Sequence, residues 1–418
     1  MKTVGIITEF NPFHKGHEYI IKKAKEVTGA DYCVIITSGN FVQRGEPSFI
    51  DKYTKTKIAL NHGANLVIEM PVQFSTASAE HFATCGVSIL NSLGIIDYLA
   101  FGVENENLEV IGNIANILNN EQDDFKKLIK QNLSNGESFA LARANALKQV
   151  IKNDNIDFLN KPNNILALEY IKALKKINSK IKPIGIKRIV ADYHEDFTDY
   201  NISHNSEFSS IDNARLYSAS NLRKLKNKEL EDILIDIDIN YKEELYKSYP
   251  LRLKNSFSNI AGSKLLDATI KNNNVYFDVP DFLWDKICNN ISNYTDFTSF
   301  IMSIKTKEIS YTSISRGLMH IILNITKHDV EYLKNNSYGN YIRVLGFRKD
   351  SSCLLTEISN NTDLALITKV SDYKDVLPKQ AIPFFEKNLY ADGVYRLCLQ
   401  EDLKQVLPTE FTRKFITV

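Results

Sequence analysis

Residues 3–17 read TVGIITEFNPFHKGH, and this order of residues sets the fold class of the chain. The apolar run Val4–Ile7 predicts a buried strand, and a turn separates it from a helix that begins near Lys15. The first backbone N–H groups of a helix are unpaired and its dipole is positive there, so this end favours an anion. Gly16 lets the backbone approach such an anion because it has no Cβ. The stretch therefore predicts a site that holds the phosphates of a nucleotide.

Short apolar runs recur along the chain, and segments with helical spacing lie between them. We expect strands at Thr3–Thr8, Asp31–Thr37, Asn65–Glu69, Asp97–Phe101 and Lys182–Ile189. We expect helices at Lys15–Val27, Asp51–His62 and Ser75–Leu93. This alternation predicts an α/β fold with a doubly wound parallel sheet. Ligands bind beyond the carboxyl ends of the strands in such folds, so one rim collects the residues that follow them: His14, Gly39, Asn40, Pro71 and Gly102.

The chain divides into two predicted domains. A nucleotide-binding domain spans residues 1–225 and contains a helical insertion at about residues 106–180. A mostly helical C-terminal domain spans residues 226–418, and its end contains two strand-like pieces, Tyr341–Leu345 and Leu364–Thr368. At 418 residues and 47.6 kDa the chain is long enough for each domain to have its own core.

Composition narrows the class of protein. A hydrophobic fraction of 44%, a charged fraction of 24% and a net charge of +1 are typical of a globular protein. The N-terminus shows no signal peptide and no apolar run approaches the roughly 20 residues that cross a bilayer, so we expect a cytoplasmic protein without membrane contact. The five cysteines are scattered and never spaced CxxC, so we expect neither a disulfide framework nor a metal site. The oligomeric state stays open.

Charge is segregated within the chain. The stretch 161–188 is rich in Lys and Arg, whereas residues 189–212 contain acids and no Lys or Arg. Such a pair could be a polyanion footprint beside an acidic loop, or simply a solvated helix face.

His14 and His17 are the candidate catalytic residues. Imidazole N–H groups can donate to phosphate oxygens as negative charge moves onto a leaving pyrophosphate, which is electrostatic stabilisation of a transition state. Phosphoryl and nucleotidyl transfers depend mainly on positioning, so no covalent enzyme residue is required. The alternative is a pair of ordinary core or surface histidines.

Three further segments are candidate ligand contacts. Ser218, Ser220 and Arg223 place two hydroxyls and a guanidinium at the start of a helix, where they could bind phosphates or act as a helix cap beside a surface Arg. The loop 39–47 could close over a reacting acid, present Arg44 to an anion, or be a structured turn that uses both of its glycines. Asn163 and Asn164 could read a nucleotide or cap the helix that begins there. Motifs of P-loop kinases, GxGxxG dehydrogenases, HExxH zincins and GxSxG hydrolases are absent from the sequence.

Taken together, these stretches resemble the bacterial tRNA(Met) cytidine acetate ligase family of the nucleotidylyltransferase superfamily. The resemblance rests on GIITEFNPFHKGHEYI (5–20), GNFVQRGEPSFIDKYTKTKIAL (39–60), ANLVIEMPVQFSTASAEHFA (64–83), AFGVEN (100–105), PNNILALEYIKALK (162–175), IKRI (186–189), KTKEISYTSISRGLMHIILNI (305–325) and YIRVLGF (341–347). It implies a Rossmann-like nucleotidylyltransferase fold. It also implies an enzyme that makes acetyl-adenylate from acetate and ATP, with Mg²⁺ as the ATP complex, and transfers acetyl to N4 of the wobble cytidine of elongator tRNA(Met).

The resemblance also assigns residues. It implies that ATP is bound by Ile7, Thr8, Glu9, Phe10, Asn11, Pro12, Phe13, His14, Lys15, Gly16, His17, Glu18, Tyr19, Ile20, Gly102, Asn163 and Arg188. The superfamily's phosphate motif ISSTxxR is degenerate here, since Ser218, Ser220 and Arg223 keep only its two hydroxyls and its Arg.

Two alternatives remain beside the ligase. One is a nucleotidylyltransferase that acts on a small phosphorylated metabolite, although a small substrate does not explain the long C-terminal half. The other is a tRNA-binding protein that only senses ATP. Candidate tRNA backbone contacts are the stretches Lys161–Arg188, Lys305–Arg316 and Arg343–Lys349.

Overall fold

The computed structural model describes most of the chain. The described residues are 1–104, 108–120, 123–135, 139–151, 161–187, 249, 252, 255–306 and 309–418. Within these ranges no helix is both long and apolar enough to cross a membrane.

A parallel sheet forms the centre of the N-terminal half, as the sequence predicts. Its strands follow the order β5-β2-β1-β6-β7, with β1 in the middle and all neighbours parallel. The bounds of these strands are β1 Thr3–Thr8, β2 Tyr32–Ser38, β5 Leu66–Met70, β6 Tyr98–Val103 and β7 Lys182–Lys187. The strand order reverses at β1, because the chain runs from β1 to β2 and β5 on one side and then returns to β6 on the other. Such a switch in strand order is where ligands bind in doubly wound folds.

Three strands from the C-terminal half extend the same sheet and make it mixed. Beyond β5 the sheet continues with β8, Tyr341–Phe347, which runs antiparallel to β5. Both β9, Ala365–Ile367, and β10, Ile416–Thr417, pair in parallel with β8. The doubly wound parallel sheet that the sequence predicts is confirmed, and the antiparallel strand β8 makes it a mixed sheet at this edge. An apolar run such as residues 341–345 predicts a strand but does not indicate its direction or its neighbour.

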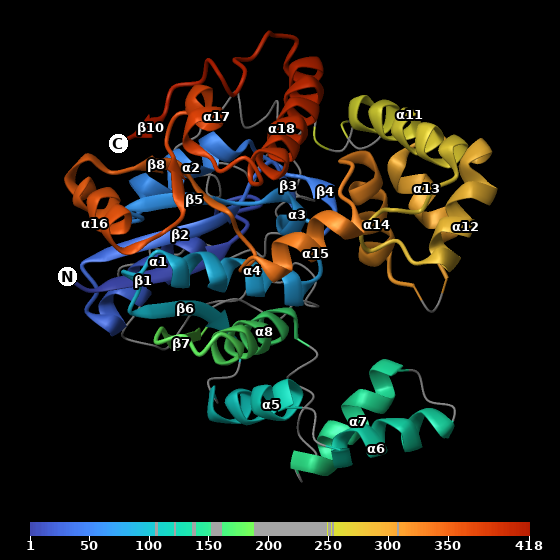
Figure 1. Ribbon diagram of the computed structural model, residues 1–418, viewed down its shortest axis with the longest axis horizontal. Helices are drawn as coiled ribbons and strands as arrows, with labels where there is room; N and C mark the ends of the chain where they lie inside the picture. The colour runs from blue at the N-terminus through green and yellow to red at the C-terminus, as the bar shows by residue number, and fades with distance from the viewer. Residues whose placement is uncertain are drawn as a thin grey trace, which may run out of the picture.

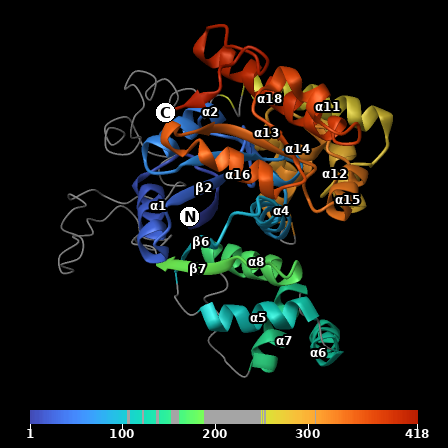
Figure 2. The same cartoon turned by 60° about the vertical axis from the view of Figure 1, so that its left-hand side comes forward.

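Helices cover both faces of the sheet. The right-handed crossovers place α1, Lys15–Thr28, and α2, Lys52–Asn61, on one face. They place α4, Ala79–Ser92, and α8, Pro162–Lys176, on the other. Figure 2 shows β2 and β6 between α1 and α4. The single helix expected over 75–93 is interrupted: α3 spans Val72–Ser75, and α4 begins after Ser78.

The remaining helices form two groups beside the sheet (Figure 1). One group, drawn below the sheet, corresponds to the expected helical insertion: α5 Leu108–Asn120, α6 Asp123–Ser134 and α7 Phe139–Ile151. The other group belongs to the C-terminal half: α11 Ser256–Lys271, α12 Asp281–Asn290, α13 Phe297–Ile304, α14 Tyr311–Ile322 and α15 Lys327–Asn335. Later helices cover the sheet edge near β8: α16 Cys353–Asn361, α17 Tyr373–Val376 and α18 Ile382–Leu403. The mostly helical character predicted for this region is confirmed.

One continuous core joins the two halves of the chain. It includes residues of β1 and β2, such as Val4 and Ile35, together with Leu318 of α14 and Tyr395 of α18, all of them buried. Because β8 pairs with β5 and this core is shared, the site at the rim of the sheet contacts elements from both ends of the chain.

Candidate functional site

The predicted nucleotide segment lies at the carboxyl end of β1 and at the first turn of α1. His14 is the N-cap of α1, and its Nδ1 accepts the backbone N–H of Gly16 at 3.1 Å. The backbone N–H of His14 in turn donates to Nδ1 of His17 at 3.2 Å. The two side chains therefore act as a reciprocal capping pair, with imidazole nitrogens in place of the usual oxygens. Since each Nδ1 is an acceptor, the ring proton of the neutral imidazole sits on Nε2 in both residues.

Two buried phenyl rings pack against the imidazole of His17. Phe10 lies edge-on to His17 with ring centroids 5.0 Å apart, and Phe13 lies 5.6 Å from the same ring. Both phenyl rings are buried. A Cβ on Gly16 would come within 2.9 Å of the His14 ring, so the absence of a side chain at Gly16 leaves room for that ring. The orientation of the two histidines thus depends on packing as well as on hydrogen bonds.

The segment is joined to the loop that follows β2. Asn11 Oδ1 accepts the backbone N–H of Phe49 at 2.7 Å, and Glu9 Oε1 accepts that of Gln43 at 2.6 Å. The loop itself contains a two-stranded hairpin, with β3 at Phe41–Val42 and β4 at Glu46–Pro47. Residues 39–47 therefore form an ordered hairpin beside the nucleotide segment, and contact of this loop with a reacting acid, or of Arg44 with an anion, stays a prediction.

Gly102 and Asn163 lie together on the neighbouring strand and helix. Gly102 is in β6, and Glu104 two residues later accepts a hydrogen bond from Asn163 Nδ2 at 2.7 Å. The backbone N–H of Glu104 donates to Asn164 Oδ1 at 3.0 Å. The Asn side chains therefore bind to the end of β6, and the N-cap residue of α8, Lys161, makes no side-chain cap. Because β6 pairs with β1, this group shares the rim with the histidines. Arg188, Ser218, Ser220 and Arg223 lie outside the described residues.

The hairpin also contacts the helical C-terminal region. Gly45 has a φ of 76°, and its carbonyl accepts a hydrogen bond from the Ser315 hydroxyl of α14 at 2.8 Å. A Cβ on Gly45 would lie 2.5 Å from the backbone nitrogen of Arg316. Only glycine combines this left-handed backbone with such a close approach of α14. The loop beside the nucleotide segment is thus in direct contact with the C-terminal half.

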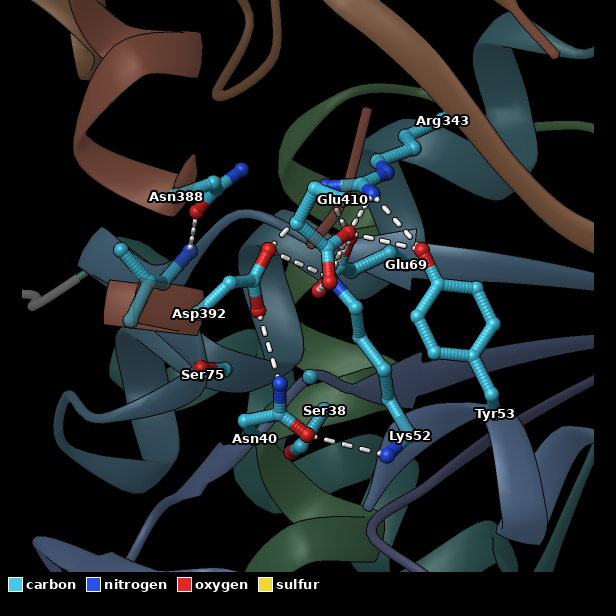
Figure 3. A network of polar contacts seen from close by, with 12 residues as sticks. Ser38, Asn40, Lys52, Tyr53, Glu69, Ser75, Arg343, Asn388, Asp392 and Glu410 are labelled. Atoms are coloured by element: carbon cyan, nitrogen blue, oxygen red, sulfur yellow. Dashed lines mark hydrogen bonds and ion pairs between the residues drawn. The ribbon is translucent and has the colours of Figure 1, made fainter. Parts of the chain in front are cut away.

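A buried ion network lies behind this loop and was not predicted from the sequence (Figure 3). Lys52 Nζ lies 3.0 Å from Glu69, 2.5 Å from Asp392 and 3.2 Å from Glu410. Arg343 Nη1 lies 3.1 Å from Glu69 and 3.3 Å from Asp392, and its Nη2 pairs with Glu410. The network reaches the loop through Asn40, whose Nδ2 donates to Asp392 at 2.9 Å. Residues of α2, β5, β8 and α18 are thereby connected.

The charges of this network are unequal, since three carboxylates face two cations. Burial and the neighbouring Glu410 raise the pKa of Asp392 to about 7. Burial disfavours the ionised form of Glu410 as well, but Lys52 and Arg343 outweigh it and lower the pKa of Glu410 to about 2. Burial and the excess of carboxylates therefore favour binding of one proton by this network near neutral pH, and Asp392 is the carboxyl whose pKa is raised.

Sequence reasoning missed this network for a definable reason. The spacing of Lys52 and Lys55 indicates that both lie on one side of α2, but Lys on a helix is normally solvated. One signal was available in the sequence, because the residues of α2 show no clear polar face. In the structure both lysines are buried together with Tyr53 and Ile58. The acidic partner Asp392 is 340 residues away in the sequence, so no local pattern could identify it.

The structure describes parts of two stretches that are candidate tRNA contacts. Arg343 is part of the buried network, so it is not a surface contact. The basic stretch that begins at Lys161 has exposed lysines at both ends of the strands of the sheet. Lys161 and Lys187 lie at the carboxyl ends of β6 and β7, whereas Lys180 and Lys182 lie at the other end of β7. Two further exposed lysines, Lys175 and Lys176, lie in the last turn of α8.

The chain is similar in sequence to known proteins over nearly its whole length. A family model described as "HIGH Nucleotidyl Transferase" matches residues 1–408. A protein of Thermoanaerobacter sp. (strain X514), named tRNA(Met) cytidine acetate ligase, is 40% identical over 404 residues and 95% of each chain. A protein of Acetivibrio thermocellus with the same name is 34% identical over 100% of each chain.

The fold is also similar to that of solved structures. The crystal structure of Thermotoga maritima TmcAL bound with alpha-thio ATP matches with a TM-score of 0.84 and 26% identity, covering 100% of this chain and 99% of that one. The apo form of the same protein matches with a TM-score of 0.85 over 100% of each chain. The mixed sheet and the helical C-terminal region are therefore shared with an ATP-binding protein.

Proposed function

The chain belongs to the HIGH nucleotidyl transferase family and to its tRNA(Met) cytidine acetate ligases, and from this premise we propose that it is an ATP-dependent acetate ligase acting on tRNA. It activates acetate as acetyl-adenylate and transfers the acetyl group to N4 of the wobble cytidine of elongator tRNA(Met). The observation that carries this proposal is the name shared by relatives that are 34% and 40% identical over nearly the whole chain.

The ATP site of the proposal is the rim of the sheet around β1. The likeness to a structure bound with alpha-thio ATP supports ATP as the nucleotide. We assign its binding to residues 7–20, to Gly102 and Asn163, and to Arg188, which lies beyond the described end of β7. Ser218, Ser220 and Arg223 remain candidates for further phosphate contacts. Mg²⁺ enters with ATP as part of the substrate.

In the first step the acetate oxygen attacks the α-phosphorus of ATP. A bond forms between these two atoms, the bond from the α-phosphorus to the bridging oxygen breaks, and pyrophosphate leaves with its negative charge. The Nε2–H groups of His14 and His17 donate toward that developing charge, and the positive end of α1 adds to their effect. Hydrogen bonds fix both rings and phenyl contacts hold the ring of His17, so little reorganisation is needed as the charge forms.

In the second step the acetyl group passes to the RNA. The exocyclic amine of cytosine attacks the acetyl carbon, AMP leaves, and the amine loses one proton. This amine is a weak nucleophile, so the acyl group must be activated and held close to it. An anticodon base can be presented out of its stack to the rim of the sheet. The division into a nucleotide-binding domain over 1–225 and a tRNA-contacting domain over 226–418 is part of this proposal, and so is a cytoplasmic location.

One experiment separates the ligase from its alternatives. The protein is incubated with labelled acetate, ATP and bulk tRNA, and the RNA is then digested to nucleosides. Label in N4-acetylcytidine supports the proposal. Label that stays out of RNA while a new adenylylated metabolite forms indicates a metabolite nucleotidylyltransferase. Binding of tRNA and ATP without any product indicates a protein that only senses ATP.

A further inference from the structure

Lys55 lies beneath the rim of the sheet, where three segments of the site meet. Its side chain is 0% exposed. Nζ donates to the carbonyl of Glu9 at 3.0 Å, to the carbonyl of Gly39 at 2.8 Å and to the Ser48 hydroxyl at 3.4 Å. Glu9 follows β1 in the nucleotide segment, Gly39 follows β2, and Ser48 follows the hairpin. One ammonium group therefore ties together the ends of two neighbouring strands and the loop between the second strand and α2.

The charge of Lys55 has only neutral acceptors. Lys52, one turn earlier on α2, faces three carboxylates, whereas Lys55 has no ion pair within 4.0 Å among the residues described. The charged groups that surround Lys55 at longer range are Glu9, Glu69, Asp51 and Lys52. Burial of the ammonium lowers the pKa of Lys55 to about 8, and these carboxylates only partly oppose the shift.

A buried cation without a carboxylate partner costs free energy, and such groups concentrate at functional sites. The role of the charged ammonium follows from the three acceptors of Lys55. Two backbone carbonyls and one hydroxyl converge on Nζ, and the three N–H donors of this single group can satisfy all three. A neutral amine donates more weakly and keeps a lone pair that would repel a carbonyl oxygen.

We propose that Lys55 is a positioning residue for adenylation: its ammonium holds the end of β1 against the end of β2 and so sets the ATP-binding segment relative to the loop 39–47. This inference rests on the proposed ligase function, because it assumes that the reacting acid and the α-phosphate meet between these two segments. Lys55 touches neither reactant and acts through Glu9 and Gly39.

The test compares Lys55→Arg and Lys55→Met with the wild type, and Lys57→Met serves as the control because Lys57 is exposed on the same helix. Acetate-dependent ATP–pyrophosphate exchange is measured between about pH 6.5 and about pH 9.5. The wild-type rate should fall about tenfold on the alkaline side as Lys55 loses its proton. Lys55→Arg should keep exchange without this alkaline decrease, since guanidinium stays charged. Lys55→Met should lose about 100-fold at every pH, as expected when reacting groups are misplaced by about 1 Å.

Thermal unfolding over the same pH range separates positioning from stability. The folded pKa of Lys55 is below its usual value, so the unfolded chain binds the extra proton between about pH 8 and about pH 10.5. Titration of Lys55 therefore raises stability with pH in this window, and Lys55→Arg should lack that rise. The proposal is supported if the wild type loses exchange at alkaline pH while its Tm does not fall relative to the Tm of Lys55→Arg. An exchange rate of Lys55→Met equal to that of Lys57→Met overturns it, and so does a flat wild-type profile, even if Lys55→Arg does not fold.

Failure of the ligase function itself has a different signature. If the wild type shows no acetate-dependent exchange at any pH, the proposed function fails, and calorimetric titration with ATP then tests Lys55 alone. Weaker ATP binding by Lys55→Met, by about tenfold, with binding retained in Lys55→Arg, still supports a positioning role toward the ATP segment. Equal ATP affinity in all variants contradicts that role.

Discussion

The imidazole rings of His14 and His17 stack with centroids 3.8 Å apart and an angle of 26° between their planes. Each ring accepts a backbone N–H on its Nδ1, so each places a donor on Nε2. Stacking of two neutral rings is favourable, whereas two imidazolium ions at this distance would repel each other. Protonation would also put a hydrogen on Nδ1 and break the cap of α1. The arrangement therefore favours two neutral hydrogen-bond donors at the positive end of the helix.

Replacement of His17 by Ala should remove one of these donors without affecting RNA binding. We expect acetate-dependent ATP–pyrophosphate exchange to fall by about 10²–10³-fold, the usual cost of losing one donor to a developing oxyanion. Affinity for tRNA, measured by filter binding, should stay within about twofold, because RNA contacts lie elsewhere in the proposal. His328→Ala is the matched control, since His328 is an exposed residue of α15. Unchanged exchange in His17→Ala would exclude His17 from the chemistry.

The sequence predicts the N-terminal half of the fold closely. The strand Thr3–Thr8 is predicted with both its ends, and β2, β5 and β6 begin within one residue of their expected positions. Buried strands of a parallel sheet are short apolar runs between polar turns, so their ends are visible in the sequence. The partner of β8 is not visible in this way. Its pairing with β5 depends on a free sheet edge that exists only after the fold has formed.

In the candidate site too, local features are predicted from the sequence and long-range contacts are not. His14, Gly16 and His17 are predicted because strand, turn and helix start are consecutive in the sequence. The contacts that hold this segment join positions far apart in the chain, such as Gly45 with Ser315 and Lys52 with Asp392. Their polar side chains are common on surfaces, and only the packing of both halves makes them buried partners.

Lys52→Met should destabilise the folded protein strongly. The variant leaves the buried carboxylates of Glu69 and Asp392 and the partly buried Glu410 with Arg343 as the remaining cation of the network, and unbalanced buried charge typically costs about 3–5 kcal/mol. The measurement is the free energy of unfolding from urea denaturation. Glu410→Gln is the control: its carbonyl oxygen can still accept from Tyr53 and Arg343, and removal of its charge balances the network, so the change should stay within about 1 kcal/mol. A Lys52→Met variant as stable as Glu410→Gln would contradict the importance of this charge balance.

Gly45→Ala should disturb the contact between the hairpin and α14. At this position a side chain is strained by the φ of 76°, and its Cβ would meet the backbone of Ser315 and Arg316 at 2.6 Å and 2.5 Å. Gly29→Ala is the matched control, because Gly29 has a φ of 61° but its nearest neighbour, Lys2 Nζ, is 4.0 Å away. The backbone term alone should cost about 1–2 kcal/mol in both variants. We expect Gly45→Ala to cost about 1–3 kcal/mol more, from overpacking. Equal unfolding free energies would show that α14 moves away without cost.

Two pairs of exposed lysines should differ in their effect on tRNA binding. Lys161 and Lys187 lie at the rim that carries the nucleotide segment. Lys180 and Lys182 lie at the opposite end of β7, and each residue of the strand adds about 3.3 Å to the separation. The proposal brings the target cytidine to the rim, so phosphates on either side of it come near the first pair. Removal of two phosphate contacts should lower the slope of log K against log salt by about 1.4–1.8 and weaken binding at low salt. We therefore expect this change in the double variant Lys161→Ser/Lys187→Ser but not in Lys180→Ser/Lys182→Ser. If Lys180→Ser/Lys182→Ser has the larger effect, the tRNA approaches the amino ends of the strands. The placement of the acceptor base at the rim with the nucleotide segment is then wrong.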